Sequence, residues 1–307
     1  MTKDSKNAES KDKAAKLLFC DKAITVALLN YYFFNGEAVI EEEGVLSLPT
    51  ESVTKEGKET DSRLRDLLYS VKVRVEDKEE TILLGIEHQS RPDYFMPQRI
   101  VEYNALEGGK QRRRLKNNHP LNFVITLVFY TGERRWNYKK NLYSITNPSS
   151  IFKPYLDRCE PDREILLIDP RRMSEEEIDK VAHPLRALFL CMKYQNDGKR
   201  FAKIISRPEM NNLSEEVRNA IKVFTGFNID DILKEEGTDN MCSAMEAIRR
   251  DFKKEGRAEG RIEGSINAFY LSVKGAIDNF GVSAEKAMDA FNVPPKDRKA
   301  LLKRLNS

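Results

Sequence analysis

Residues 61–90 read DSRLRDLLYSVKVRVEDKEETILLGIEHQS, and this stretch decides the fold. Its apolar residues alternate with polar ones from Leu67 to Val75, a polar segment follows, and an apolar run leads from Thr81 to His88. This pattern predicts a strand, a turn and a second strand. The hairpin carries Asp66 immediately before its first strand and Glu87 near the end of its second.

The two acids are predicted to lie close together. Folding the chain back about residues 77–78 places Asp66 opposite Gln89 and Glu87 a diagonal step away, within reach of a cross-strand neighbour. Glu87 and Gln89 share one face of the strand, whereas His88 points to the other face. A carboxylate at the end of a buried strand is costly unless a cation or a metal ion compensates it. Divalent-metal cleavage of phosphodiester bonds is the chemistry that fits two such carboxylates.

A purely structural interpretation of the same acids stays open. Asp66 would then cap its strand and pair with Arg63 or Arg65, and Glu87 would be the partner of a structural ion pair. The residue pattern by itself does not decide between the two interpretations.

The hairpin resembles a known family in its motifs. The matching residues are Arg65–Tyr69, Gly85–Ser90, Met96–Tyr103, Val128–Gly132 and Trp136. They are similar to the recombination-promoting nuclease (Rpn) family, also called PD-(D/E)XK nuclease family transposases, over roughly residues 12–190. The resemblance implies an α/β fold, with a restriction-endonuclease-like mixed sheet flanked by helices. It also implies Mg²⁺-dependent DNA endonuclease activity that promotes recombination or DNA mobility.

The same resemblance implies roles for individual residues. Asp66 and Glu87 match the metal-binding carboxylates, the carbonyl of His88 would be a further ligand, and Mg²⁺ or Mn²⁺ would be the cofactor. Gln89 completes the catalytic set at the place where the wider superfamily usually has lysine. An ammonium group stabilises developing negative charge, whereas a neutral amide only orients its neighbours by hydrogen bonds.

Two groups of basic residues are candidates for contacts with DNA. The densest basic run is Lys110–Lys116, which contains Arg112, Arg113 and Arg114. It could track a phosphate backbone, or it could be an ordinary solvated segment. Arg99 follows Glu87 on the next predicted helix, where it could contact a phosphate or pair with Glu102 or Asp93.

The whole chain divides into three predicted parts. Residues 1–11 are polar and predict a disordered tail, residues 12–195 the nuclease-like domain, and residues 196–307 a helical C-terminal region. Within these parts the pattern predicts helices at 13–34, 94–110, 185–194, 283–291 and 296–305, strands at 45–48, 121–130 and 165–170, and a polar loop at 54–60. The strand before residue 90 and the strand at 121–130 should run parallel, because a helix connects them.

A four-residue Glu-Gly repeat marks residues 254–264. It is typical of a solvated helical linker, but its glycines could also let two helices approach closely in a homo-oligomer. The last two predicted helices form either an ordinary helical hairpin, with Ser283 as an N-cap, or a helix-turn-helix that faces phosphate.

Composition sets wider bounds. A net charge of +3 and a pI of about 8.5 are too low to indicate nucleic-acid binding alone, so a DNA footprint must be a local patch. The four cysteines and three histidines are scattered, which argues against zinc. A polar N-terminus and the lack of a long apolar run predict a cytoplasmic protein without a membrane span. A non-cleaving DNA-binding or protein-interaction module on a nuclease scaffold is the alternative function.

Overall fold

The computed structural model describes residues 3–56, 59–64, 66–115, 119–143, 145, 164–232 and 266–305. They belong to two compact units, Met1–Cys242 and Ser243–Ser307, and each is described by itself. This division differs from the boundary that we expected near residue 195. The helices on both sides of that position pack on one another, so the earlier part of the helical region belongs to the larger unit.

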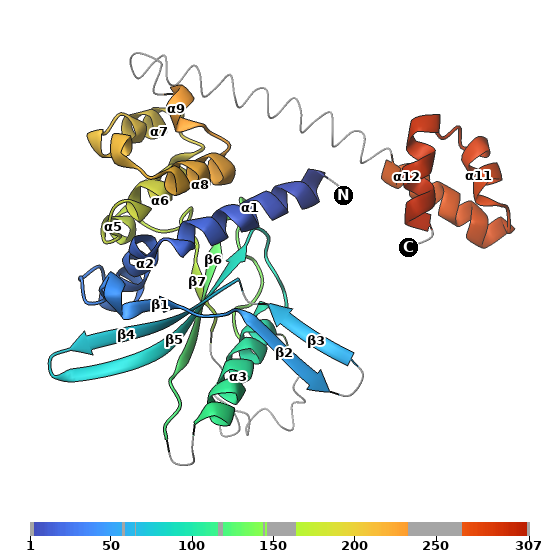
Figure 1. The fold of residues 1–307 in the computed structure, drawn as a ribbon. Coiled ribbons are helices and arrows are strands. Elements are labelled where there is room, and N and C mark those ends of the chain that lie inside the picture. Colours follow the sequence, from blue (N-terminus) through green and yellow to red (C-terminus); the bar gives the residue numbers. More distant parts are fainter. Residues whose placement is uncertain are drawn as a thin grey trace. The chain divides into compact units, whose positions relative to one another are not determined.

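A five-stranded mixed sheet forms the centre of the larger unit (Figure 1). Its order is β1-β4-β5-β6-β7, with bounds Val45–Ser47, Leu67–Val75, Lys78–Gln89, Val124–Tyr130 and Leu166–Ile168. Strand β4 is antiparallel to both of its neighbours, β1 and β5, whereas β5, β6 and β7 run parallel to one another. The mixed α/β fold and the parallel pairing of β5 with β6 are therefore confirmed.

The hairpin of β4 and β5 is present, but its register differs from the prediction. Leu67 pairs with Ile86, so the continuation of the ladder brings Asp66 opposite Glu87 and not opposite Gln89. The turn comes one residue earlier than expected, because Glu76 adopts a left-handed conformation with φ of 54°. Alternation along a strand does not locate a tight turn, and this shift brings the two acids closer in register.

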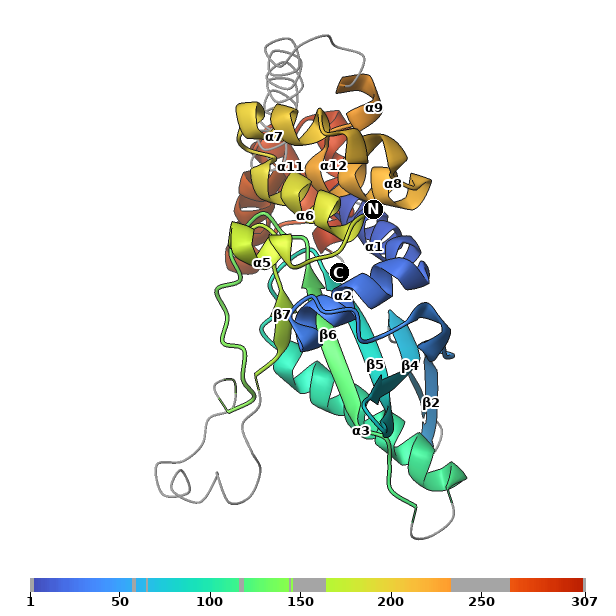
Figure 2. The ribbon, with the colours of Figure 1, turned by 90° about the vertical axis from the view of Figure 1, so that its left-hand side faces the viewer.

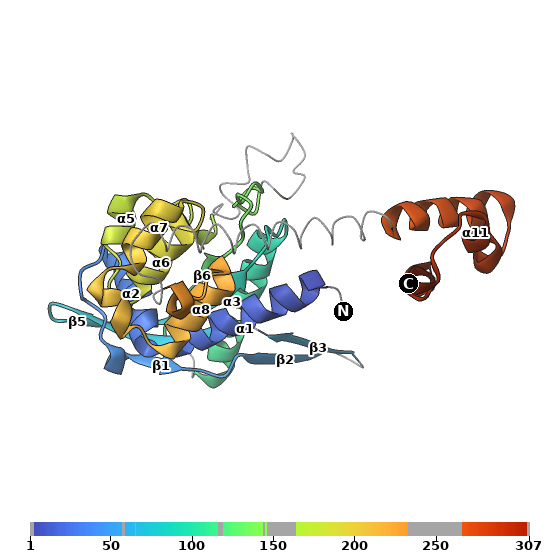
Figure 3. The ribbon, with the colours of Figure 1, turned by 90° about the horizontal axis from the view of Figure 1, so that it is seen from above.

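Helices cover both faces of the sheet (Figures 2 and 3). Helix α3, Met96–Arg114, connects β5 to β6 and packs on one face of the sheet. The other face carries α1 Lys3–Cys20, α2 Lys22–Phe34, α5 Glu175–Asp179, α6 Leu185–Tyr194, α7 Gly198–Ile205, α8 Glu215–Thr225 and α9 Ile229–Ile232, with the short 3₁₀ turns η1 Glu42–Gly44 and η2 Pro208–Asn212. Helix α1 lies along α8, as the view from above shows.

Strand β6 divides the core between these two layers. The ring of Phe129 packs against Phe19, Phe189 and Phe224 of the larger helical layer, with centroid distances of 5.0 to 6.0 Å. Its neighbours in the chain serve the other layer, where the buried cluster is Met96, Val128, Tyr130, Trp136 and Ile165. Neighbouring residues of a strand face opposite sides, so both layers are fixed by one short segment.

Two predictions for the N-terminal half are corrected. The polar residues from Lys3 to Lys11 are helical, not disordered, and the helix that we expected at 13–34 is broken at Asp21, which caps α2 by accepting a hydrogen bond from the amide of Ala23. Packing of α1 on α8 accounts for the first difference, because tertiary contacts stabilise helices that composition disfavours. Of the loop predicted at 54–60, residues 54–56 belong to β2, Glu51–Glu56, and residues 59–60 to β3, Glu59–Leu64, which form a separate antiparallel pair.

None of the described helices is by itself both long and apolar enough to span a bilayer. Only the pair Asn7–Cys20 and Lys22–Phe34, which is bent by 87°, reaches that length and composition together.

The smaller unit is helical. A helix over 266–280, α11 Ala284–Ala290 and α12 Pro295–Leu305 enclose the buried residues Val273, Ala287, Met288, Val293 and Leu301. The hydroxyl of Ser283 caps α11, as predicted. Arg298 is engaged within the unit, 2.6 Å from Asp289, and Arg304 lies over the ring of Tyr270. The Glu-Gly repeat lies outside the described residues, and self-association through these helices stays a prediction.

Arg171 joins the end of β6 to the helical layer. One of its terminal nitrogens donates to the carbonyl oxygen of Thr131 at 2.8 Å, and the other donates to Gln195 at 2.9 Å and to the carbonyl oxygen of Phe224 at 2.8 Å. Loss of this side chain would leave three buried or half-buried acceptors without their donor, which is expensive inside a protein.

Arg171→Met should therefore lower the free energy of unfolding of the larger unit by about 2–4 kcal/mol. Urea denaturation followed by the fluorescence of Trp136 measures this, since Trp136 is the one tryptophan of the chain and packs on Tyr130. Lys199→Met, at an exposed position of α7, should change stability by less than about 0.5 kcal/mol. Equal unfolding midpoints for the two variants would contradict the assignment.

Candidate active site

The candidate site lies where the parallel strands β5 and β6 end. Gln89 pairs with Tyr130 in the ladder, and the amide of Thr131 donates to the carbonyl oxygen of Gln89 at 2.9 Å. The motifs Glu87–Ser90 and Tyr130–Gly132 are thereby brought side by side, although about 40 residues separate them in the chain. The carboxyl ends of parallel strands are a usual position for ligand sites.

Gly132 permits this close approach. A Cβ atom at this position would lie 2.7 Å from the carbonyl oxygen of Ser90 and would also collide with the hydroxyl of Tyr130. The hydroxyl of Tyr130 in turn donates to the carbonyl oxygen of Arg134 at 2.7 Å, which fixes the path of the chain beyond β6.

Glu87 is buried in the layer of α3. Its side chain is 1% exposed, and its Oε2 lies 3.5 Å from a terminal nitrogen of Arg99. Arg99 also lies 2.8 Å from Asp93 and 3.3 Å from the hydroxyl of Tyr103. Burial opposes the charge of Arg99, but hydrogen bonds with Tyr103 and Asp93 outweigh it and raise its pKa. The ion pair between Arg99 and Asp93, which the sequence suggested as an alternative to a phosphate contact, is present.

Asp66 turns its carboxylate toward β5 and α1. Its Oδ2 accepts a hydrogen bond from the backbone N–H of His88 at 2.9 Å, and its Oδ1 lies 3.0 Å from the Nζ of Lys16. The cationic partners of Asp66 and Glu87 thus come from helices on opposite faces of the sheet. The alternative pairing of Asp66 with Arg63 or Arg65 falls on side chains outside the described set.

His88 lies in the layer opposite Glu87, as the alternation of the strand predicts. Its Nε2 is 2.8 Å from the hydroxyl of Thr131, and its ring stacks on Phe224 at a centroid distance of 6.0 Å. Its backbone N–H faces the β4 side of the sheet, and in an extended strand the carbonyl of the same residue faces that side as well. The backbone carbonyl of His88 therefore lies on the edge of β5 that Asp66 approaches.

Helix α1 supplies a cation that sequence reasoning missed. Lys16 bridges Asp12 at 2.9 Å and Asp66 at 3.0 Å, and Asp12 lies 3.5 Å from the Nδ1 of His88. Burial acts to lower the pKa of Lys16, but hydrogen bonds with Asp12 and Asp66 outweigh it and raise the pKa to about 12. The hydrogen bond with His88, followed by that with Lys16, holds the pKa of Asp12 below its usual value. The four-residue spacing of Asp12 and Lys16 was the only signal in the sequence.

The donor set fits a divalent metal ion in its chemistry. Two carboxylates and a backbone carbonyl are oxygen ligands of the kind that Mg²⁺ and Mn²⁺ prefer. Within the described parts of the chain, no three His, Cys, Asp or Glu side chains gather closely enough to hold a metal by themselves. A metal at Asp66 and Glu87 would therefore need the backbone oxygen of His88, and it would share Asp66 with the ammonium of Lys16.

The basic run is not brought to the acids. Arg112, Arg113 and Arg114 form the last turn of α3, which has 19 residues and is about 28 Å long. This helix starts after the end of β5 and leads back to the beginning of β6. Its last turn therefore lies toward the amino ends of these strands, whereas Glu87 lies near the carboxyl end of β5. Contact of these arginines with DNA stays a prediction, but they would meet it far from the acids.

Comparison with known proteins gives one match. The model of the family described as "Putative transposase, YhgA-like" matches residues 11–240, which is almost the whole of the larger unit. Nothing among curated proteins or solved structures matches the chain. Since the matched span covers well over half of the 307 residues, the chain belongs to the YhgA-like transposase family.

Proposed function

We propose that this chain is a metal-dependent DNA endonuclease that hydrolyses phosphodiester bonds. The observation that carries the proposal is the register of β4 and β5, in which Asp66 falls opposite Glu87 beside the backbone of His88. Membership of a transposase family supports DNA as the substrate, and cleavage would promote recombination or mobility of DNA.

In this proposal Asp66, Glu87 and the carbonyl of His88 would hold Mg²⁺ or Mn²⁺. When bound there, such an ion would supply a water molecule of lowered pKa and positive charge next to the scissile phosphate. Arg99 places its guanidinium 3.5 Å from the buried carboxylate of Glu87, and Gln89 would orient water or phosphate by hydrogen bonds. Lys16 places an ammonium next to Asp66, where it can stabilise the negative charge that develops on the phosphate.

A non-cleaving DNA-binding or protein-interaction module is the second candidate. It is favoured by the cations that already compensate both acids, and by the glutamine at position 89. In that case the ion pairs would be structural, and the acids would bind no metal. The experiments below separate the two functions.

Asp66→Asn and Glu87→Gln should each lower Mn²⁺-dependent nicking of supercoiled plasmid by roughly 100-fold, equivalent to about 2.7 kcal/mol of transition-state stabilisation. Both changes keep the side-chain shape and remove the charge that binds metal. The measurement is the initial rate of nicking by the full chain, with Trp136 fluorescence confirming that each variant is folded.

Glu79→Gln is the matched control for these variants. Glu79 lies on the same strand as Glu87 but near the turn, where it pairs with Lys72 and Arg74. Its replacement should leave the nicking rate unchanged. If the acid variants nick plasmid as fast as this control, Asp66 and Glu87 do not carry the chemistry.

Lys16→Gln should lower kcat at saturating Mn²⁺ by about tenfold or more, and it should not weaken Mn²⁺ binding measured by calorimetry. The reason is that the ammonium acts on the phosphate but repels a metal at Asp66. Lys16→Arg should retain part of the rate.

Lys13→Gln removes the same charge from an exposed position on the same helix and serves as the control. A Lys16→Gln variant that is as fast as Lys13→Gln, or faster, would show that the ammonium only competes with the metal.

A further inference from the structure

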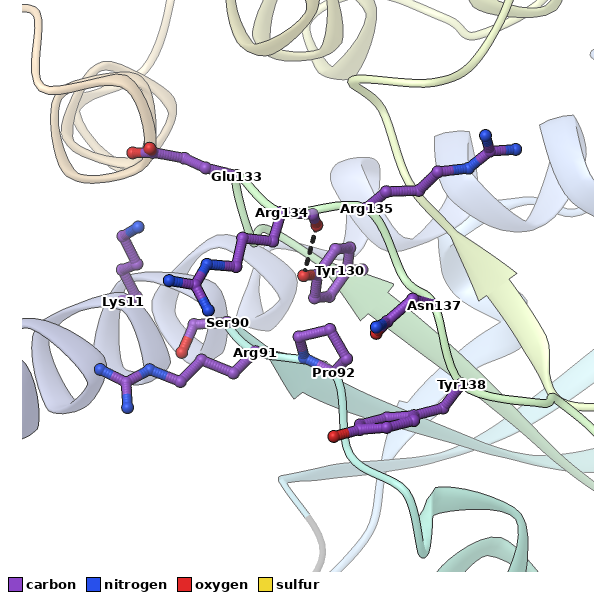
Figure 4. Close-up of a pocket in the computed structure, with 10 residues that line it drawn as sticks. All are labelled: Lys11, Ser90, Arg91, Pro92, Tyr130, Glu133, Arg134, Arg135, Asn137 and Tyr138. Carbon is purple, nitrogen blue, oxygen red and sulfur yellow. Dashed lines mark hydrogen bonds between the residues drawn. The ribbon is translucent and has the colours of Figure 1, made fainter. Parts of the chain in front are cut away.

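A basic pocket opens directly beyond the candidate active site (Figure 4). It has a volume of about 670 Å³ and is formed by the segments that follow β5 and β6, together with α1. The pocket is lined by four basic residues and one acidic residue, Glu133. The basic residues are Lys11, Arg91, Arg134 and Arg135, and the other lining residues are Ser90, Pro92, Tyr130, Asn137 and Tyr138.

Three of the basic groups lie together. Figure 4 shows the side chains of Arg91, Arg134 and Lys11 on the same side of the pocket near Ser90, whereas the guanidinium of Arg135 points away from them. Burial, the Arg171 guanidinium and then Arg91 lower the pKa of Lys11, and Glu133 only partly opposes them. A cleft that is lined mainly by positive charges attracts and stabilises an anion, because the anion relieves the repulsion between the cations.

Exposed aromatic rings adjoin this pocket. Tyr138 lines it, is 42% exposed, and meets the ring of Tyr94 edge to face at a centroid distance of 5.6 Å. Tyr94 in turn contacts Phe95, which is 60% exposed. Large apolar rings at the surface are costly to leave in water, and next to cations they offer a platform for a nucleobase.

We propose that this pocket binds the phosphodiester backbone of a nucleic-acid strand through Lys11, Arg91 and Arg134, with an unpaired base stacked on Tyr138. The proposal adds a binding site for the substrate of the proposed endonuclease. It rests on that function for the position of the scissile phosphate. Ser90 follows Glu87 by three residues, about 10 Å along an extended strand. One strand carries a charge about every 3.4 Å of helix axis, so phosphates next to the scissile one would fall within the pocket.

This placement also explains how a chain of low net charge can hold DNA. The densest basic run of the sequence, which includes Arg112–Arg114, lies toward the amino ends of β5 and β6. Lys11, Arg91 and Arg134 are far apart in the sequence and come to one pocket only in the fold. A small anion would use the cations alone. The aromatic rings beside them favour a ligand that carries bases as well as phosphates.

The test is binding of a labelled oligonucleotide of about 20 nucleotides by the full chain, in EDTA and between about 50 and 200 mM NaCl. Arg91→Gln and Arg134→Gln should each raise Kd roughly tenfold and reduce the slope of log Kd against log salt by about one. Arg135→Gln makes the same change of charge in the neighbouring residue and should leave the slope unchanged. Equal slopes for all three variants would overturn the proposal.

Tyr138 tests the base contact separately. Tyr138→Ala should weaken single-stranded binding by roughly tenfold, and Tyr138→Phe should restore it, because stacking needs the ring and not the hydroxyl. An identical loss in the alanine and phenylalanine variants would overturn the stacking. Inorganic phosphate and thymidine monophosphate are added as competitors. A site that binds either as tightly as the oligonucleotide is a small-anion site, and the strand assignment then fails.

Binding and cleavage are read separately. Loss of binding in the pocket variants supports the pocket even if the wild type never nicks plasmid, in which case only the endonuclease function fails. Conversely, metal-dependent nicking that depends on Asp66, together with unchanged binding in the pocket variants, supports the endonuclease function and removes the pocket.

Discussion

The side-chain alternation of β5 is the constraint on which the rest of the larger unit depends. Because neighbouring residues face opposite layers, Glu87 meets Arg99 of α3, while His88 meets Thr131 and Phe224 on the other face. A shift by one residue would put the acid among the phenylalanine rings of the helical layer. The hydrophobic core therefore fixes the register, and the register fixes which polar groups come together at the end of the strand.

The two ion pairs of the site differ in energy and so in role. Glu87 is almost completely buried, and breaking a buried ion pair by removing one partner typically costs several kcal/mol, so the pair with Arg99 contributes to the stability of the fold. The side chains of Lys16 and Asp66 are 42% and 18% exposed, and such a pair contributes roughly 0–1 kcal/mol. Such a small contribution to stability does not by itself account for the position of Lys16, and the proposed function gives this ammonium a role next to Asp66.

Much of this arrangement was predictable from the sequence. The strands of the central sheet, the crossover through α3 and the cap at Ser283 follow from periodicity and local hydrogen bonding, which neighbouring residues determine. The turn at Glu76 was misplaced by one residue because alternation does not specify where a strand reverses. The polar start of α1 and the positions of Lys16 and Arg171 could not be predicted. Each depends on a partner far along the chain, and local patterns do not contain such contacts.

Helix α1 has a consequence for the order in which the protein is made. It brings Lys11, Asp12 and Lys16 to three different parts of the site, and its most extensive packing partner is α8, which is synthesised some 200 residues later. A chain emerging from the ribosome grows at roughly 5–20 residues per second, so both acids exist for several seconds before α1 can pack on α8. Until α8 is made, an unfinished chain lacks the main packing partner that places Lys11 in the pocket and Lys16 beside Asp66. In the proposed function, a chain of this length would therefore be incomplete for acting on DNA.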